Sequence, residues 1–275
     1  MNAFKQKCIA LRKKDFTLNE IVKKTGRSKT SVYFHIKNIP LSKRKLRQVA
    51  KNSRIRALKN ADARRGKALR PYKPFSTWSP GLVLLVSHML FDGGFKKSCV
   101  YSNRSSSLIH RVEKLMKGVY EFEPKKSTDT RTGVHRISYH NVELANHMKD
   151  KANALLREIR HMSSAHQCEF LRAFFDDEGC MDYRAKHNKR RVRGYQKDKK
   201  ILYLIQELLK NFGIESTLQS KNEVVISGKA NLQKFQKEIN FSKGVRLNPK
   251  RANSIWKKPI EKHVLLDIAI RSFKT

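Results

Sequence analysis

The 275-residue chain contains 61 Lys and Arg residues against 23 Asp and Glu, which gives a formal net charge of +38. A positive surplus of this size indicates a polyanionic partner, of which nucleic acid is the usual one. The sequence has no apolar run long enough to span a bilayer and no signal-peptide core, which argues against a membrane partner and against secretion.

Residues 1–41 are predicted to form a helix-turn-helix segment that binds DNA. Thr17 followed by Glu20 is a capping box that starts one helix, Gly26 ends it, and Ser28 can cap the next. In such a segment the second helix enters the major groove. The residues expected to face DNA are Arg27, Lys29, Thr30, Tyr33 and Lys37. The alternative is a plain helical hairpin with a solvated basic face.

A basic linker is predicted over residues 42–77. Residues 42–73 are almost all basic or small, and Asp62 is the only acid among them. The apolar residues are too sparse for a core, so the charges either follow DNA phosphates, as a helix formed on DNA, or belong to a flexible tail. Three prolines in PYKPFSTWSP then mark a domain boundary near residue 75.

The rest of the chain repeats one order of predicted elements: helix, strand, strand, helix, strand, strand, helix. The first copy covers residues 78–162 and the second residues 163–255, and a C-terminal helix is expected in residues 256–275. We therefore expect an α+β fold of two pseudo-symmetric αββαββα half-domains. A small all-α helix-turn-helix and the basic linker precede them.

Each copy opens with an apolar helix that ends on an acid and a glycine. LVSHMLFDGG ends on Asp92 and Gly93, and FLRAFFDDEG ends on Glu178 and Gly179. An acid at a helix C-terminus is disfavoured by roughly 0.3–1 kcal/mol, because the unpaired carbonyl groups there carry partial negative charge. The glycines stand where a helix usually stops, since glycine takes the left-handed turn without penalty. Two such ends indicate that something cationic compensates the carboxylates.

This pair of motifs resembles the LAGLIDADG homing endonucleases over roughly residues 78–255. The matching runs are residues 85–93 and 171–179, of which the second is the better match. The resemblance implies that the two motif helices pack against each other. Helices that approach closely need small side chains at their crossing, and Ser87 and Ala173 occupy the corresponding position in the two motifs.

The resemblance also implies that Asp92 and Glu178 are catalytic and metal-binding, one acid from each motif helix. Two carboxylates so close repel each other. Mg²⁺ is a hard cation that needs one or two carboxylates together with phosphate and water, and Mn²⁺ is the expected substitute. At helical spacing Asp176 and Asp177 point elsewhere and receive no role. His88 is expected to be a core histidine with its hydrogen bonds satisfied.

The strands after each motif are expected to form a saddle whose face follows double-stranded DNA. The basic residues expected on it are Lys96, Lys97, Lys186, Lys189, Arg190, Arg191 and Arg193.

We therefore expect a monomeric, site-specific double-strand DNA endonuclease that depends on Mg²⁺ and cuts a long asymmetric target. A non-cutting transcription regulator on the same scaffold is the alternative, favoured by the divergent first motif and the helix-turn-helix. A third possibility is an intron maturase that binds RNA with the saddle. The four scattered cysteines are read as reduced thiols of an intracellular protein, in the cytoplasm with the nucleoid or in the organelle that encodes it.

Overall fold

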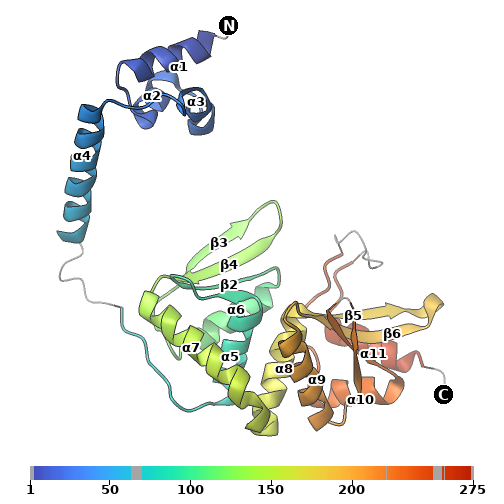
Figure 1. Cartoon of the computed structure of the whole chain (residues 1–275). Coiled ribbons are helices and arrows are strands. Elements are labelled where there is room, and N and C mark those ends of the chain that lie inside the picture. Colours follow the sequence, from blue (N-terminus) through green and yellow to red (C-terminus); the bar gives the residue numbers. More distant parts are fainter. Residues whose placement is uncertain (1–2, 63–69, 221, 250–255, 257, 274–275) are drawn as a thin grey trace. The chain divides into compact units, whose positions relative to one another are not determined.

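The structure, a computed structural model, describes residues 3–62, 70–220, 222–249, 256 and 258–273 (Figure 1). The chain divides into two compact units, residues 1–69 and residues 70–275. Within the described ranges, no helix combines the length and the apolar character needed to cross a bilayer.

Three short helices form the core of the first unit: α1 (Ala3–Lys13), α2 (Leu18–Thr25) and α3 (Lys29–Ile36). The predicted capping box is present, because the Thr17 N–H donates to Glu20 Oε2 at 2.6 Å and the Glu20 N–H donates to Thr17 Oγ1 at 3.4 Å. Gly26 ends α2 in the left-handed region at φ 65°. Ile21, Val32 and Ile36 are buried together, as their spacing predicts.

The sequence analysis missed α1, which completes this core. Cys8 of α1 is fully buried, and Phe4 and Leu11 pack against the same cluster. Their spacing of four and three residues places them on one helical face. The expected linker is itself helical over much of its length, as α4 (Lys43–Asp62). Apolar side chains of α4 such as Leu46 and Leu58 are exposed, in keeping with a segment that builds no core.

The second unit contains two successive sets of elements in the same order. The first set is α5 (Pro80–Phe91), β1 (Gly93–Gly94), β2 (Cys99–Asn103), α6 (Ser106–Met116), β3 (Lys125–Asp129), β4 (Val134–Tyr139) and α7 (Val142–Glu158). The second set is α8 (Ser164–Glu178), β5 (Gly179–Arg184), β6 (Lys189–Tyr195), α9 (Lys199–Asn211), β7 (Ser216–Gln219), β8 (Glu223–Ser227) and α10 (Lys229–Glu238). Helix α11 (Lys262–Arg271) follows, and short 3-10 turns lie at Ile159–His161 and Ala185–His187.

Each set contributes one four-stranded antiparallel sheet, with strand orders β1-β2-β4-β3 and β5-β6-β8-β7. The two orders are equivalent when the strands of each set are matched in sequence. The fold is therefore α+β with two such sheets and additional N-terminal helices, as predicted. Side-chain caps set the starts of several helices: Ser79 for α5, Ser105 for α6, Asn141 for α7 and Asp198 for α9.

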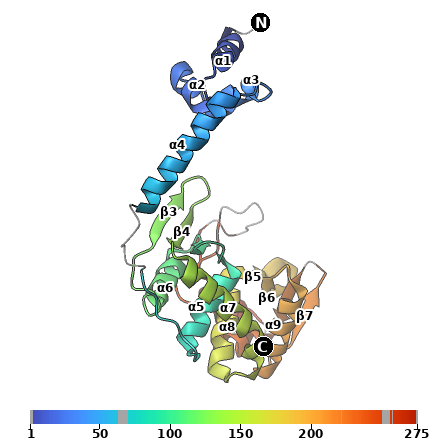
Figure 2. The same cartoon turned by 60° about the vertical axis from the view of Figure 1, so that its left-hand side comes forward.

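The helices of each set contact their own sheet. Helices α5, α6 and α7 contact the first sheet, and α8 to α11 contact the second (Figures 1 and 2). One continuous hydrophobic core joins the two sets through α5 and α8. The ring of Phe91 in α5 lies 5.2 Å from Phe174 and 5.5 Å from Phe170 in α8, centroid to centroid.

Candidate functional site

The two motif helices α5 and α8 pack against each other along their lengths. Ser87 and Ala173, the small residues of the two motifs, are both fully buried. The helices therefore end close together, and the acid at the end of each lies beside the other set of elements. Asp92 follows α5 as its C-cap and Glu178 is the last residue of α8.

The glycines after these acids do not adopt the left-handed turn that the sequence analysis expected. Gly179 has a φ of −94°, and Gly93 is also outside the positive-φ region. Their requirement is steric. A Cβ atom would lie 2.3 Å from the Met89 carbonyl oxygen at Gly93, and 2.4 Å from the Phe175 carbonyl oxygen at Gly179. In both motifs the chain turns directly from helix into strand so closely that only glycine fits.

Asp92 and Glu178 line one groove of about 1350 Å³. Burial, and after it the charges of Asp177 and Glu178, raise the pKa of the Asp92 carboxyl from an ordinary 3.8 to about 7. A hydrogen bond from Asn103 and the charge of Lys262 act in the opposite direction on this pKa. The Asn103 amide donates to Asp92 Oδ2 at 2.6 Å. Acids from both motifs therefore share one partly buried, negatively charged site.

The Asp177 side chain points into this site, and the expectation that it points elsewhere is wrong. Its side chain is fully buried. Its carboxylate accepts the Tyr101 hydroxyl at 2.7 Å and the Asn103 amide at 3.3 Å, and lies 2.8 Å from His88 Nδ1. Consecutive residues of an α-helix point about 100° apart, so the Asp177 side chain does leave α8 in a different direction from Glu178. In that direction lie α5 and β2 of the first set of elements, and not solvent.

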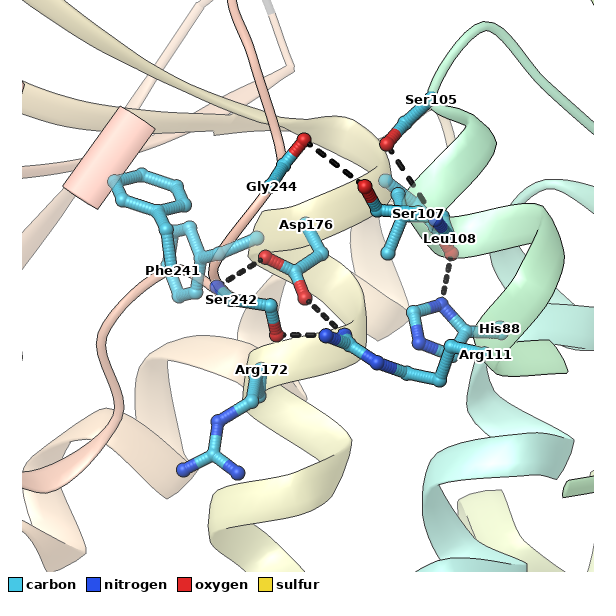
Figure 3. A network of polar contacts seen from close by, with 12 residues as sticks. His88, Ser105, Ser107, Leu108, Arg111, Arg172, Asp176, Phe241, Ser242 and Gly244 are labelled. Atoms are coloured by element: carbon cyan, nitrogen blue, oxygen red, sulfur yellow. Dashed lines mark hydrogen bonds and ion pairs between the residues drawn. The ribbon is translucent and has the colours of Figure 1, made fainter. Parts of the chain in front are cut away.

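Asp176, also assigned no role from the sequence, anchors a second polar network. Nη1 of Arg111 donates to Asp176 Oδ2 at 3.0 Å and to the Ser242 hydroxyl at 2.6 Å, and the Ser242 N–H donates to Asp176 Oδ1 at 2.9 Å (Figure 3). Arg111 belongs to α6 and Ser242 follows α10. The network therefore ties both sets of elements to the end of α8.

Lys262 supplies a cation at the end of α8, and sequence reasoning did not find it. Its Nζ donates to the carbonyl oxygens of Asp176 at 2.6 Å and of Phe175 at 3.2 Å, and the residue is only 6% exposed. A cation at a helix C-terminus is favourable, since it faces the partial negative charge of the last carbonyls. Lys262 also lines the groove that contains Asp92 and Glu178.

The donor set of Asp92 and Glu178 fits a hard divalent cation. Both side chains offer carboxylate oxygens. Burial first, and then the charges of Asp177 and Glu178, raise the pKa of Asp92, and a bound cation would offset both effects. No cluster of three or more His, Cys, Asp or Glu that could hold a metal occurs among the described residues. Mg²⁺ can bind through one or two carboxylates and completes its coordination with water and phosphate oxygens.

The predicted basic residues of the saddle lie in different settings. Lys96 and Lys97 are exposed between β1 and β2, Lys186 is exposed in the Ala185–His187 turn, and Lys189 is exposed at the start of β6. Arg191 and Arg193 lie on the face of the second sheet opposite its helices. Arg190 differs from the prediction, because side chains alternate along a strand and it lies on the helix side. There its Nε donates to the Ser272 hydroxyl at 2.7 Å.

The predicted DNA-facing residues of the first unit, Arg27, Lys29, Thr30, Tyr33 and Lys37, are all exposed. Tyr33 is 54% exposed, and its neighbour Phe34, which the sequence analysis passed over, is 67% exposed. Lys37 Nζ lies 5.2 Å from the centre of the Phe34 ring. The outer surface of α3 is therefore both basic and aromatic.

Comparison with solved structures returns several chains of similar fold at low sequence identity. Variants of the homing endonuclease I-DmoI are 20% identical, with a TM-score of 0.44 over 62% of this chain and 95% of that chain. The N-terminal LAGLIDADG domain of DUF199/WhiA is 17% identical, with a TM-score of 0.45 over 62% of this chain and 88% of that one. Full-length DUF199/WhiA from Thermatoga maritima is 16% identical, with a TM-score of 0.46 over 73% and 63%. Likeness at this level assigns no activity to the chain.

Comparison with protein families gives a match to one part of the second unit. Residues 165–240 match the family described as LAGLIDADG-like domain. No protein with a curated description matches the chain. The matched range runs from the second residue of α8 through α10, and so includes Ala173, Glu178 and the whole second sheet. Residues 165–240 of the chain therefore form a LAGLIDADG-like domain.

Proposed function

We propose that the chain is a site-specific endonuclease that cuts double-stranded DNA with Mg²⁺. The observation that carries the proposal is the meeting of Asp92 and Glu178 in one groove, at the ends of two packed helices from two equivalent sets of elements. Residues 78–162 are then a divergent first half-domain, and residues 163–255 are its pseudo-symmetric partner. A single chain supplies both acids, so the active species is a monomer.

In this proposal Asp92 and Glu178 hold the metal, which when bound supplies Lewis-acid activation of water and stabilisation of the leaving oxygen. Mn²⁺ would substitute for Mg²⁺. The other residues of the site act on the acids. Asn103 orients the Asp92 carboxylate through its 2.6 Å hydrogen bond, and Asp177 holds Asn103 and Tyr101 in place. Lys262 brings a positive charge to the groove that favours ionised Asp92.

DNA binding is assigned to the two sheets and to residues 1–41. A net charge of +38 supports a polyanion as partner. Lys96, Lys97, Lys186, Lys189, Arg191 and Arg193 would bind the DNA on the open faces of the sheets, and we withdraw Arg190 from this set. The exposed face of α3 would enter a neighbouring major groove, and residues 42–77 would follow the phosphates between the two contacts.

A non-cutting DNA-binding regulator is the second candidate, and the first unit favours it. Its capped three-helix core and exposed basic helix α3 are what sequence-directed binding alone requires. The retained acids at both helix ends favour cutting, since carboxylates facing DNA weaken binding unless a metal uses them. An RNA-binding maturase would use the same basic faces.

The experiment that tests the proposal is a cleavage assay of the full chain on a randomised plasmid library, and on the encoding locus with its insertion removed, with Mg²⁺ or with Mn²⁺. The expected result is a double-strand break at one long sequence, and none in EDTA. Binding should weaken with salt, with a slope of about −0.9 in log affinity against log salt for each phosphate neutralised. Specific binding without cleavage in either metal would favour the regulator.

A further inference from the structure

An acid lies in the middle of the basic face of the second sheet. The open face of this sheet, opposite α8, carries Asp182 and Arg184 of β5 and Arg191 and Arg193 of β6. Asp182 is directly opposite Arg191 in the antiparallel register. Arg184 and Arg193 lie two residues further along their strands, so all four side chains leave the sheet on the same side.

Asp182 contacts all three arginines. Its Oδ1 accepts from Arg184 Nε at 3.2 Å, and its Oδ2 accepts from Arg191 Nε at 2.9 Å and lies 2.9 Å from a terminal nitrogen, Nη2, of the same guanidinium. Arg193 Nε is 3.7 Å from Oδ2. The Asp182 side chain is 7% exposed, whereas those of Arg184 and Arg191 are 38% and 25% exposed. The acid is therefore beneath the arginines, which reach past it to solvent.

This placement is unfavourable for general attraction to DNA. A carboxylate under a DNA-binding face cancels part of the positive charge and so weakens contacts to phosphate. It has a different effect on geometry, because a guanidinium paired along one edge is fixed in one orientation. Asp182 occupies the Nε–Nη2 edge of Arg191. Among the described residues no hydrogen bond occupies its Nη1, so the terminal N–H groups of the guanidinium that point away from Asp182 remain available to a ligand.

We propose that Asp182 orients Arg184 and Arg191 to read guanine in the half of the DNA target that lies on the second sheet. The O6 and N7 atoms of guanine are two adjacent acceptors in the major groove, and the two parallel N–H groups of an oriented guanidinium match them. Arg184 also lines the groove that contains Glu178, which places it on the face turned toward the proposed cleavage site. The inference rests on the proposed DNA-binding function and goes beyond it by naming guanine as the base that the second sheet recognises.

The first sheet is built differently on its corresponding face. There Arg136 of β4 donates through Nε to the Ser102 hydroxyl at 3.1 Å, a neutral partner that neither attracts nor fixes the guanidinium as a carboxylate does. Guanine preference from oriented arginines is therefore expected in one half of the target only. Asp182 is a positioning residue, because it acts on DNA through its arginines.

The test is a selection of bound sequences from duplex DNA with a randomised segment, carried out on the full chain and three variants. Asp182→Asn removes the orienting charge, and Arg191→Lys keeps the positive charge but removes the fork. Glu207→Gln is the matched control, because Glu207 of α9 also pairs with an arginine, Arg160, at 3.3 Å. It raises the net charge by one, as Asp182→Asn does, but Glu207 is exposed on the outer side of α9 and does not line the groove.

The wild type and Glu207→Gln should select guanine at fixed positions of one half of the site. Each oriented arginine should favour guanine over other bases by about 5- to 150-fold. Asp182→Asn should lose most of this preference while it binds unselected duplex DNA at least as tightly as the wild type. Arg191→Lys should lose the preference at one position by a larger factor than it loses affinity for unselected DNA, because the lysine keeps the positive charge. This variant decides the matter if thermal denaturation shows that Asp182→Asn is misfolded.

Unchanged guanine preference in Asp182→Asn and Arg191→Lys would overturn the inference and leave the proposed function intact. A uniform loss of binding to all sequences in a folded Asp182→Asn would also overturn it, because the acid would then serve stability and not reading. A wild type that binds no duplex DNA would overturn the proposed function and this inference with it.

Discussion

Asp177 Oδ2 lies 2.8 Å from His88 Nδ1, with both side chains fully buried, and this contact joins the two motif helices close to their acidic ends. Through its other oxygen the same carboxylate accepts the Tyr101 hydroxyl. Asp177 of the second half thus lies beside the site of Asp92 and Glu178, and residues of the first half hold it there. The two halves differ here, since Phe91 holds the position in α5 that Asp177 holds in α8.

Replacing Asp177 with Asn should lower the pKa of the Asp92 carboxyl, because one of the two neighbouring charges that raise it is removed. Carbon-detected NMR titration of the aspartate carboxyls would measure this pKa. Asp267→Asn is the control, since Asp267 pairs with Arg271 on α11 and is not among the charges that shift the pKa of Asp92. An Asp92 pKa that is the same in wild type and Asp177→Asn would show that the two carboxylates do not interact.

Without metal, the contribution of Asp92 to stability should decrease as the pH rises from about 4 to about 7. Its pKa is raised to about 7 in the folded protein, against 3.8 as its ordinary value, so in this window the folded state keeps a proton that the unfolded chain releases. The free energy of unfolding of wild type minus that of Asp92→Asn should therefore fall across this window and level off above pH 7. Urea unfolding at several pH values in EDTA measures it. A difference independent of pH would mean that Asp92 titrates normally.

Replacing Ala173 with Leu should destabilise the second unit by roughly 1–3 kcal/mol, because the side chain is fully buried in α8, the helix that packs on α5. Ala230→Leu in α10 is the matched control, since Ala230 is exposed and the change there should stay within about 0.5 kcal/mol. Chemical denaturation followed by circular dichroism compares the two. Equal stability of both variants would place Ala173 at a site with free space, away from the helix crossing.

Deleting residues 1–41 should shorten the DNA footprint and weaken binding without removing metal-dependent cutting. The helices of this segment form a core of their own, and the first unit is compact apart from the second. Nuclease protection on the selected target compares the full chain with the deletion, and cleavage of the same duplex is the control for the second unit. A footprint of unchanged length would assign the segment a partner other than DNA.

The elements that recur along the chain could be predicted because their signals are local. The Thr17 capping box and Gly26 mark the two ends of α2 in the first unit, and the sequence predicts the repeated order of helices and strands in the second. Helix α1 escaped because its apolar face has only three members, Phe4, Cys8 and Leu11, which is a short pattern for one helix.

The surroundings of the two acids could not be predicted, because they depend on which elements meet in space. Helical spacing correctly separates Asp177 from Glu178, but only the position of α5 and β2 shows that this direction leads into the site. Lys262 reaches the end of α8 from a helix 84 residues later in the chain, since 262 − 178 = 84, and no local pattern signals that approach. Gly93 and Gly179 do stand at the helix ends, as predicted, but the predicted left-handed turn is wrong. Glycine is required there because a carbonyl oxygen of the preceding turn lies too close for a Cβ atom.

The most direct measurement of the central claim is cleavage and binding of one selected DNA duplex by wild type, Asp92→Asn and Glu178→Gln, in Mg²⁺ and in EDTA. Both substitutions keep the size of the side chain and remove its charge. If the carboxylates hold the metal, each variant should lose cleavage strongly or completely, while it binds the duplex as tightly as the wild type or more tightly, since negative charge facing phosphate is removed. A wild type that binds the duplex but does not cut it in Mg²⁺ or Mn²⁺, with both variants binding equally well, would contradict the endonuclease and leave a DNA-binding regulator.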